Sequence, residues 1–244
     1  MTLFEALLLV GGGLAAGWIN AVAGGGSILT VPLLVLAGVP GNDANGSNRI
    51  GILTSNMAAA ISFRRLGVGG LSHASTVIAP VVVGSLIGST AISRLTDETF
   101  ETVFGLLMVP LIILSVRKPK IKEGGPTWSR STIVVVFFFI GLYGGAIQAG
   151  VGLVLLAALT RAGFDLITAN NIKVVVTLVV TAVALPVFIL NGQIAWLPAL
   201  VLAVGFTGGG WLGARSAVRG GERLIRIVML IATAVLAGRL IGLY

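Results

Sequence analysis

Two glycine-rich stretches interrupt long apolar segments of this chain, and they constrain its fold more than any other feature. The first, AGGGSILTVPLL, covers residues 23–34, and the second, GLYGGAIQAGVGLVLLAAL, covers residues 141–159. Glycine inside a helix costs about 1 kcal/mol relative to alanine, so consecutive glycines favour a break. Inside a bilayer, non-helical backbone is tolerated only where protein buries it or where it lines a cavity. The sequence therefore predicts two helix breaks in the interior of a membrane protein.

The composition agrees with a membrane location. Of the 244 residues, 56% are hydrophobic and 10% are charged, and the mean hydropathy is +1.06. Soluble domains carry about 25% charged residues. Apolar runs of spanning length recur along the whole chain, which excludes a soluble domain with a single anchor. Glycines four residues apart, at Gly84–Gly88 and Gly209–Gly213, predict close contacts between helices.

Ten apolar segments flank a polar, basic linker, RKPKIKEGGPTWSR, at residues 117–130. In each half, one long segment precedes a short one and three of near-spanning length. The segments cover residues 3–22, 28–37, 47–63, 74–92, 99–116, 132–149, 151–161, 168–190, 195–214 and 223–242.

An offset of 125 residues relates the two halves, and it takes Asn45 to Asn170. The sequence therefore predicts an all-α, polytopic membrane protein built from two repeats. The first repeat covers 1–116 and the second covers 132–244, with a cytoplasmic linker at 117–131. Each repeat is expected to contain a broken helical hairpin with one short arm, followed by three transmembrane helices.

The basic residues predict the orientation. One arrangement places 13 of the 16 Lys and Arg residues on one side and leaves Arg49, Arg94 and Arg239 on the other. The first side is then cytoplasmic. Each half crosses the membrane an odd number of times, so the halves are inverted and both termini lie outside the cell (inner) membrane. Inverted repeats with broken helices are typical of transporters, whose substrate site lies near the midplane.

The helices that start at the two breaks predict an anion site. A helix N-terminus carries unpaired N–H groups and partial positive charge, and glycine lets an anion approach the backbone. The alternative is that the glycines only permit tight packing. The candidate substrate-binding residues at the breaks are Gly24, Gly25, Gly26, Ser27, Gly150 and Gly152.

Polar residues form a stripe on one face of each helix that follows a short segment. In the first half the stripe contains Asn45, Asn48 and Asn56, and in the second it contains Asn170, Lys173, Thr177 and Thr181. Such groups must face the bundle or water, because lipid cannot satisfy them. Arg49 adds a cation to the first stripe. For Arg49 and Lys173, snorkelling to the membrane surface is the alternative.

Asn20 and Gln148, in the long arms of the two hairpins, are further polar candidates. Other chemistries find little support. Apart from Glu101 at the start of the 99–116 segment, Glu5 is the one acidic residue within an apolar segment, so a proton relay is not expected. Ser27 has no base within the apolar segments, which disfavours an intramembrane enzyme. Cysteine is absent and His73 is the only histidine, so no metal or cofactor is expected. The sparse charges in loops do not indicate nucleic-acid binding.

The first half resembles the sulfite exporter TauE/SafE family, also called toluene-sulfonate-uptake-type permeases. The matching motif reads Gly24-Gly25-Gly26, Val31-Pro32-Leu33-Leu34, Gly38 and Ala44-Asn45-Gly46-Ser47. The second half matches more loosely, at Gly150-Val151-Gly152 and Ala169-Asn170-Asn171, and lacks an equivalent of Pro32. The resemblance adds Ser47 and Asn171 to the candidate site. It implies a carrier of small sulfur-containing anions such as sulfite or organosulfonates. The direction of transport implied by the family is mostly outward.

The leading hypothesis is therefore a transporter, with export favoured, that alternates access to a midplane site between the repeats. Its partners would be a small sulfur-containing anion and membrane lipid, and a homodimer is left open. The alternative from another class is a non-transporting membrane subunit that binds a partner through the linker at 117–130.

Overall fold

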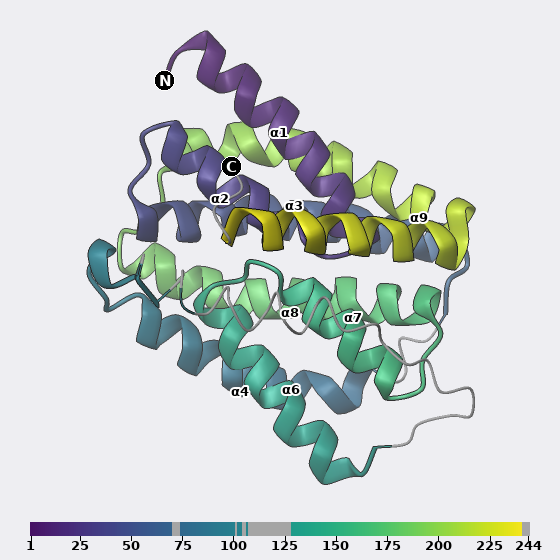
Figure 1. The fold of residues 1–244 in the computed structure, drawn as a ribbon. Coiled ribbons are helices and arrows are strands. Elements are labelled where there is room, and N and C mark those ends of the chain that lie inside the picture. Colours follow the sequence, from purple (N-terminus) through teal and green to yellow (C-terminus); the bar gives the residue numbers. More distant parts are fainter. Residues whose placement is uncertain (70–73, 101, 104–105, 107–127, 241–244) are drawn as a thin grey trace.

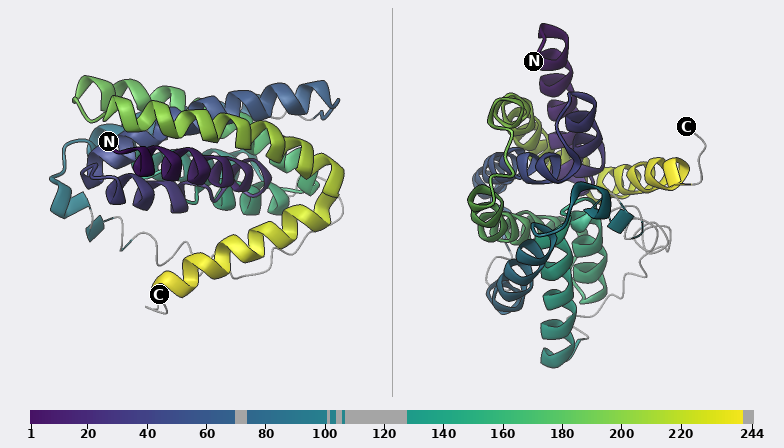
Figure 2. Two further views of the ribbon diagram at one scale, coloured as in Figure 1. Left: turned by 90° about the horizontal axis from the view of Figure 1, so that it is seen from above. Right: turned by 90° about the vertical axis from the view of Figure 1, so that its left-hand side faces the viewer.

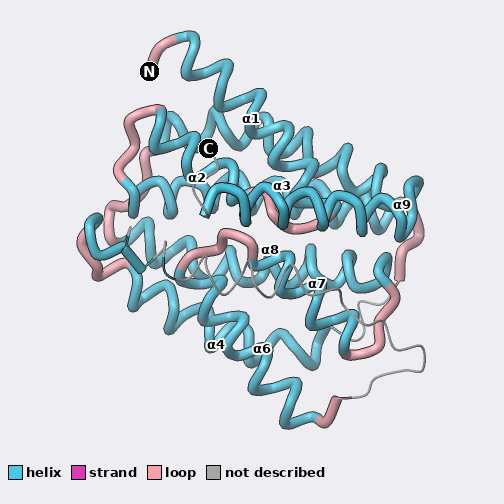
Figure 3. Tube along the Cα trace, viewed as in Figure 1, coloured by secondary structure: helices cyan, strands magenta, loops and turns pink. Residues whose placement is uncertain are grey.

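The computed structural model describes residues 1–69, 74–100, 102–103, 106 and 128–240. Its regular structure in these ranges is helical, as predicted (Figure 1, Figure 3). The helices are α1 (Leu3–Val22), α2 (Ser27–Leu36), α3 (Gly41–Arg65), α4 (Ala74–Ile92), α6 (Arg130–Ala146), α7 (Val151–Arg161), α8 (Leu166–Leu190) and α9 (Trp196–Leu240). Most of the predicted segment at 99–116 and of the linker at 117–131 lies outside the described residues.

Both predicted breaks are present. Helix α1 ends at Val22, and Gly24 adopts a φ of 88° before α2 begins. Helix α6 ends at Ala146, and Gln148 and Gly150 adopt φ values of 65° and 72° before α7 begins. This left-handed region is sterically open to glycine and costly for most other residues, so the helix cannot continue through it. The two short predicted segments are the helices α2 and α7.

Helix α8 begins at a capped end. The Asp165 side chain accepts hydrogen bonds from the backbone N–H groups of Ile167 (3.1 Å) and Thr168 (2.9 Å). Partial burial acts to raise the pKa of Asp165, but these hydrogen bonds outweigh it and hold the pKa below its ordinary value. The charged cap favours the start of the helix that carries Lys173.

Helix α9 joins two predicted segments into one element. Its backbone leaves the helical region at Gly221, with φ 58° and ψ −160°, so residues 196–220 and 222–240 form two arms. Figure 2 shows the second arm, in yellow, turning away from the first. Glycine at this position allows the positive φ that the turn requires.

Small residues bring two helix pairs into backbone contact. Gly84 and Gly88 of α4 face α6, and Gly209 and Gly213 of α9 face α1. A Cβ at any of these positions would lie within 3.0 Å of a carbonyl oxygen on the facing helix, closer than real Cβ atoms approach. The predicted role of both glycine pairs in helix contacts is therefore confirmed.

The helices of the two halves intertwine. Helix α4, from the first half, packs against α6 and α8 of the second, while α9 packs against α1 and α3 of the first. Helices α3 and α8 contact each other at the centre (Figure 1). One core cluster accordingly contains residues of both halves, including Ala21, Phe63, Leu155, Val176 and Ala214. Burial of the apolar surface of either half therefore depends on the other.

Several helices have the properties of membrane spans. By length and composition, α1, α8 and the Trp196–Ile225 part of α9 can cross a bilayer; the other apolar helices are shorter. Large apolar side chains cover the outer surface, such as Leu3 (78% exposed), Val204 (69%) and Leu190 (86%). Helix α3 has 25 residues and turns most of its polar side chains inward. An apolar exterior around a polar interior suits a protein in lipid.

Candidate functional site

The two glycine-rich breaks contact each other. A Cβ on Gly24 would lie within 3.0 Å of the Gly152 Cα, and a Cβ on Gly152 would lie equally close to the Gly24 Cα. Backbone therefore packs directly on backbone, which only glycine allows at both positions. The two breaks thus meet at buried positions.

The helices that leave the breaks start without a side-chain cap. Gly26 is the N-cap of α2 and Gly150 is the N-cap of α7, and neither helix has a capping side-chain hydrogen bond. The partial positive charge at the start of each helix is therefore not offset by a capping side chain of the described residues. Ser27, the first residue of α2, is 2% exposed.

Lys173 lies at the end of α1. Its side chain is 1% exposed, and Nζ donates to the backbone oxygens of Asn20 (2.7 Å) and Ala21 (3.3 Å). These carbonyls belong to the last turn of α1, where the helix dipole favours a cation. The alternative that Lys173 snorkels to the membrane surface is therefore wrong.

Arg49 lies at the end of α6 in the same manner. It is fully buried; Nη2 donates to the oxygens of Gly145 (2.6 Å) and Ala146 (3.0 Å), and Nη1 donates to Gly144 (3.2 Å). The guanidinium also stacks on the Phe188 ring, 4.4 Å from its centroid. Snorkelling is excluded for Arg49 as well.

Two asparagines reinforce these contacts in matching positions. Asn45 Nδ2 donates to the Ala146 oxygen (2.8 Å), and Asn170 Nδ2 donates to the Ala21 oxygen (3.0 Å). Adding 125 takes Asn45 to Asn170 and also takes Ala21 to Ala146. Helix α3 thus caps the broken helix of the second half, while α8 caps the broken helix of the first.

Buried donors without a partner surround these contacts. Among the described residues, the unpartnered donor nitrogens include Asn20 Nδ2, Asn48 Nδ2 and Arg49 Nε. The Thr177 hydroxyl is also unpartnered. An unpaired buried donor costs about 1–3 kcal/mol, so a bound acceptor would be stabilising here. The charged side chains that are buried in the described part of the chain are Arg49 and Lys173. The described interior therefore holds two cations together with unpartnered donors and unpartnered acceptors, the latter including the Oδ1 atoms of Asn45 and Asn170.

Comparison with known proteins identifies the family of the chain. The family model described as "Sulfite exporter TauE/SafE" matches residues 9–240. The chain belongs to the sulfite exporter TauE/SafE family.

TauE/SafE relatives of similar length share modest identity with the chain. A "Probable membrane transporter protein" of Haemophilus influenzae is 27% identical over 94% of this chain and 91% of its own length. The "Probable membrane transporter protein YfcA" of Escherichia coli K12 is 27% identical over 93% and 86%, respectively. The "Probable membrane transporter protein ORF9" of Sinorhizobium sp. is 25% identical over 93% and 88%. No solved structure matches the chain. The family and these relatives support a membrane transporter.

Two residues of the TauE/SafE-like motif lie apart from the breaks. Ser47 Oγ accepts from the backbone N–H of Ala195 (2.8 Å), just before α9. Asn171 Nδ2 donates to the oxygens of Val68 (3.1 Å) and Gly69 (2.9 Å), after α3. Both side chains fix connections between elements. Their predicted role as substrate ligands stays a prediction.

Two further candidates, Gln148 and Asn56, make hydrogen bonds of different kinds. Gln148 accepts from Arg49 Nη1 (3.0 Å) and donates to Thr181 Oγ1 (3.0 Å). Its positive φ is unusual for a residue with a side chain, and such backbone is common at functional sites. Asn56 Nδ2 donates to the Ile52 oxygen of its own helix (2.8 Å), which leaves its own Oδ1 unpartnered.

Sequence reasoning missed three contributors to this region of the TauE/SafE protein. Thr30 of α2 is fully buried and donates to Asn48 Oδ1 (2.5 Å). Phe188 covers the Arg49 guanidinium, and the Tyr143 hydroxyl donates to the Ala149 oxygen within the second break. Because Thr30 lies one helical turn after Gly26, the sequence alone could have indicated that it lies beside a break. The aromatic residues gave no signal, because apolar helices contain such residues everywhere.

Proposed function

We infer that this TauE/SafE family member carries a small sulfur-containing anion, such as sulfite or an organosulfonate, across the cell membrane. One observation carries the proposal: the contact between the breaks at Gly24 and Gly152 lies among elements that bury two cations and no carboxylate in the described residues. The family's description as sulfite exporters supports the sulfur anion, and the names of the relatives support transport.

The chemistry of this region fits an anion better than a cation or an apolar solute. Lys173 and Arg49 supply fixed positive charge, and the starts of α2 and α7 supply uncapped positive dipole ends. The unpartnered nitrogens of Asn20, Asn48 and Arg49 are donors that oxygen atoms of a sulfite or sulfonate group can accept.

The proposed mechanism is alternating access, and the matching contacts of Asn45 and Asn170 in the two halves support it. The proposed repeats, 1–116 and 132–244, are inverted and meet at the breaks, with the linker at 117–131 cytoplasmic and both termini outside. In this proposal, the backbone contact between Gly24 and Gly152 closes the path of the anion between the repeats. The helix pairs α1–α9 and α4–α6 would rock about α3 and α8. This motion would open the site between the breaks to one side of the membrane at a time.

Export requires no proton relay in this proposal. A membrane potential that is negative inside favours the exit of each negative charge by about 2.3 kcal/mol per 100 mV. The proposed driving force is therefore the potential and the gradient of the anion itself.

The test is transport by purified protein in liposomes. Sulfite and short alkyl sulfonates should cross faster than in protein-free liposomes, and the rate should rise with an outward-driving potential. Thermal-shift measurements should show stabilisation that rises with the concentration of the transported anion. Equal flux in protein-free liposomes for every sulfur anion, together with no thermal shift, would overturn the proposal.

A further inference from the structure

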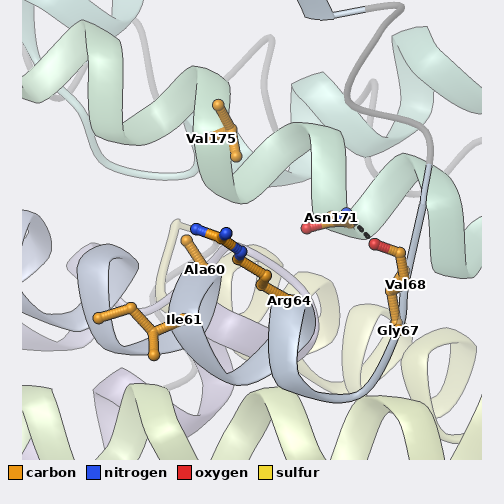
Figure 4. Close-up of a pocket in the computed structure, with 7 residues that line it drawn as sticks. All are labelled: Ala60, Ile61, Arg64, Gly67, Val68, Asn171 and Val175. Atoms are coloured by element: carbon orange, nitrogen blue, oxygen red, sulfur yellow. Dashed lines mark hydrogen bonds between the residues drawn. The ribbon is translucent and has the colours of Figure 1, made fainter.

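A cavity of about 410 Å³ lies between the C-terminal end of α3 and the first turns of α8 (Figure 4). Its walls are mainly apolar and include Ile61 from α3, Val68 from the segment after α3, and Val175 from α8. Arg64 and Asn171 are its polar lining residues. A volume in the range of about 300–1,000 Å³, apolar walls and few polar groups are typical of ligand sites.

The cavity is separate from the proposed transport site. Asn171 and Val175 lie one turn apart on the same face of α8. Lys173 is two residues from each, which rotates it by about 200° to the opposite face of the helix. Its Nζ contacts α1, away from the cavity. The cavity is thus an additional site, and its assignment does not depend on the transported substrate.

Arg64 provides the cavity with a cation. Its side chain is exposed, and Figure 4 shows the guanidinium extending into the space between α3 and α8. The one ion pair found in the described residues joins the N-terminal amine to Glu5, so no described carboxylate pairs with Arg64. Asn171 already donates its amide hydrogens to the oxygens of Val68 and Gly69, which fixes the segment after α3 as one wall.

The surroundings of the cavity resemble the level of lipid head groups. Ile61, on its rim, is 47% exposed, as expected for a side chain in contact with acyl chains. Arg65 and Arg215 stack on the Trp211 ring at 5.2 and 4.6 Å from its centroid. Tryptophan with basic neighbours is typical of the membrane–water interface. A head group at Arg64 would therefore place its chains beside Ile61 and Val175.

We propose that the cavity between α3 and α8 binds an anionic phospholipid, with its phosphate on Arg64 and an acyl chain along Ile61 and Val175. Basic pockets between membrane helices bind anionic head groups in this manner. The apolar walls would cover a chain, and the single guanidinium would select a negative head over a zwitterionic one. A lipid bound there would bridge α3 and α8, the two central helices.

The test measures lipid binding to the full chain by native mass spectrometry, with phosphatidylglycerol and phosphatidylcholine as probes. The parent should retain phosphatidylglycerol in preference to phosphatidylcholine. Arg64→Gln should lower phosphatidylglycerol binding by about fivefold, the effect of one basic residue near an anionic surface. Arg65→Gln is the matched control and should leave the Arg64-dependent binding unchanged, because Arg65 stacks on Trp211 and does not line the cavity. Val175→Phe, which fills the cavity, should lower the binding as well.

Two outcomes would overturn the assignment. Unchanged phosphatidylglycerol binding in Arg64→Gln, with Arg65→Gln also unchanged, would show that the cavity does not hold the lipid. Arg64-dependent binding of octane sulfonate without any Arg64-dependent binding of phosphatidylglycerol would assign the cavity to a free amphipathic anion instead. Because Arg64 is exposed, Arg64→Gln should fold like the parent, so the comparison remains decisive even if Val175→Phe is unstable.

Discussion

Lys173 of α8 donates a hydrogen bond to the backbone oxygen of Asn20 at the end of α1, with 2.7 Å between Nζ and the oxygen. The two residues lie 153 positions apart in the chain. The contact explains how a lysine can be buried without a carboxylate: carbonyls at the end of a broken helix carry partial negative charge. A cation held in this manner stabilises the break, and in the proposed function it is also the charge that the anion contacts.

Lys173→Gln should weaken anion binding and reduce stability together. Glutamine can still donate to the Asn20 oxygen, but it removes the charge. A hydrogen bond from a charged group contributes about 1.5–3 kcal/mol, so the loss of unfolding free energy should stay within that range. Measuring the melting temperature of the protein at increasing sulfite concentrations checks both effects. Arg219→Gln, which removes an exposed cation, is the control and should change neither quantity. Parent-like sulfite affinity in Lys173→Gln would restrict this lysine to a structural role.

Asn45→Ala and Asn170→Ala should cost similar amounts of stability. Each removes one hydrogen bond to the end of a broken helix, from Asn45 to Ala146 or from Asn170 to Ala21. The expected loss is about 0.5–1.5 kcal/mol for either variant. Unfolding in detergent measures the two losses under identical conditions. A large difference between them would argue against equivalent roles for the two asparagines in the proposed repeats.

Gly152→Ala should disrupt the contact between the breaks. Its Cβ would overlap the Gly24 backbone, which cannot move aside as a flexible side chain could. Overpacking of this kind typically costs about 1–3 kcal/mol. Gly11→Ala is the control, since a Cβ there meets nothing within 4 Å, and it should leave the protein unchanged or slightly more stable. Melting temperature and sulfite flux should both fall in Gly152→Ala. If they match the Gly11→Ala values, the breaks do not pack as described.

Cysteine labelling should reveal the orientation, because the chain has no native cysteine. Gly124→Cys, in the linker, should resist a membrane-impermeant maleimide in intact cells and react after lysis. Asn191→Cys, exposed between α8 and α9, should react from outside. The reason is the concentration of basic residues on the linker side. Labelling of position 124 but not of 191 in intact cells would reverse the proposed orientation.

The sequence was most informative where a residue type restricts the backbone or must avoid lipid. Glycine clusters located both breaks at Gly24 and Gly150, and the spacing of Asn45, Asn48 and Asn56 located the inward face of α3. The helical fold class and the family followed from the same residues. The hydrogen-bond partners of individual polar side chains were harder to predict from the sequence. Ser47 and Asn171 carry the motif, yet their side chains hold loops rather than line the breaks.

The residue types alone were enough to predict that the chain is helical, belongs in a membrane, and breaks two of its helices at glycine. These properties depend on local backbone freedom and on transfer of side chains from water to lipid, and both can be judged from neighbouring residues. By contrast, the contacts by which Lys173 caps α1 and Arg49 caps α6 arise from the packing of the folded chain. Those contacts join residues about 100–150 positions apart. They depend on how α3 and α8 pack against the broken helices, which the spacing along one helix does not specify.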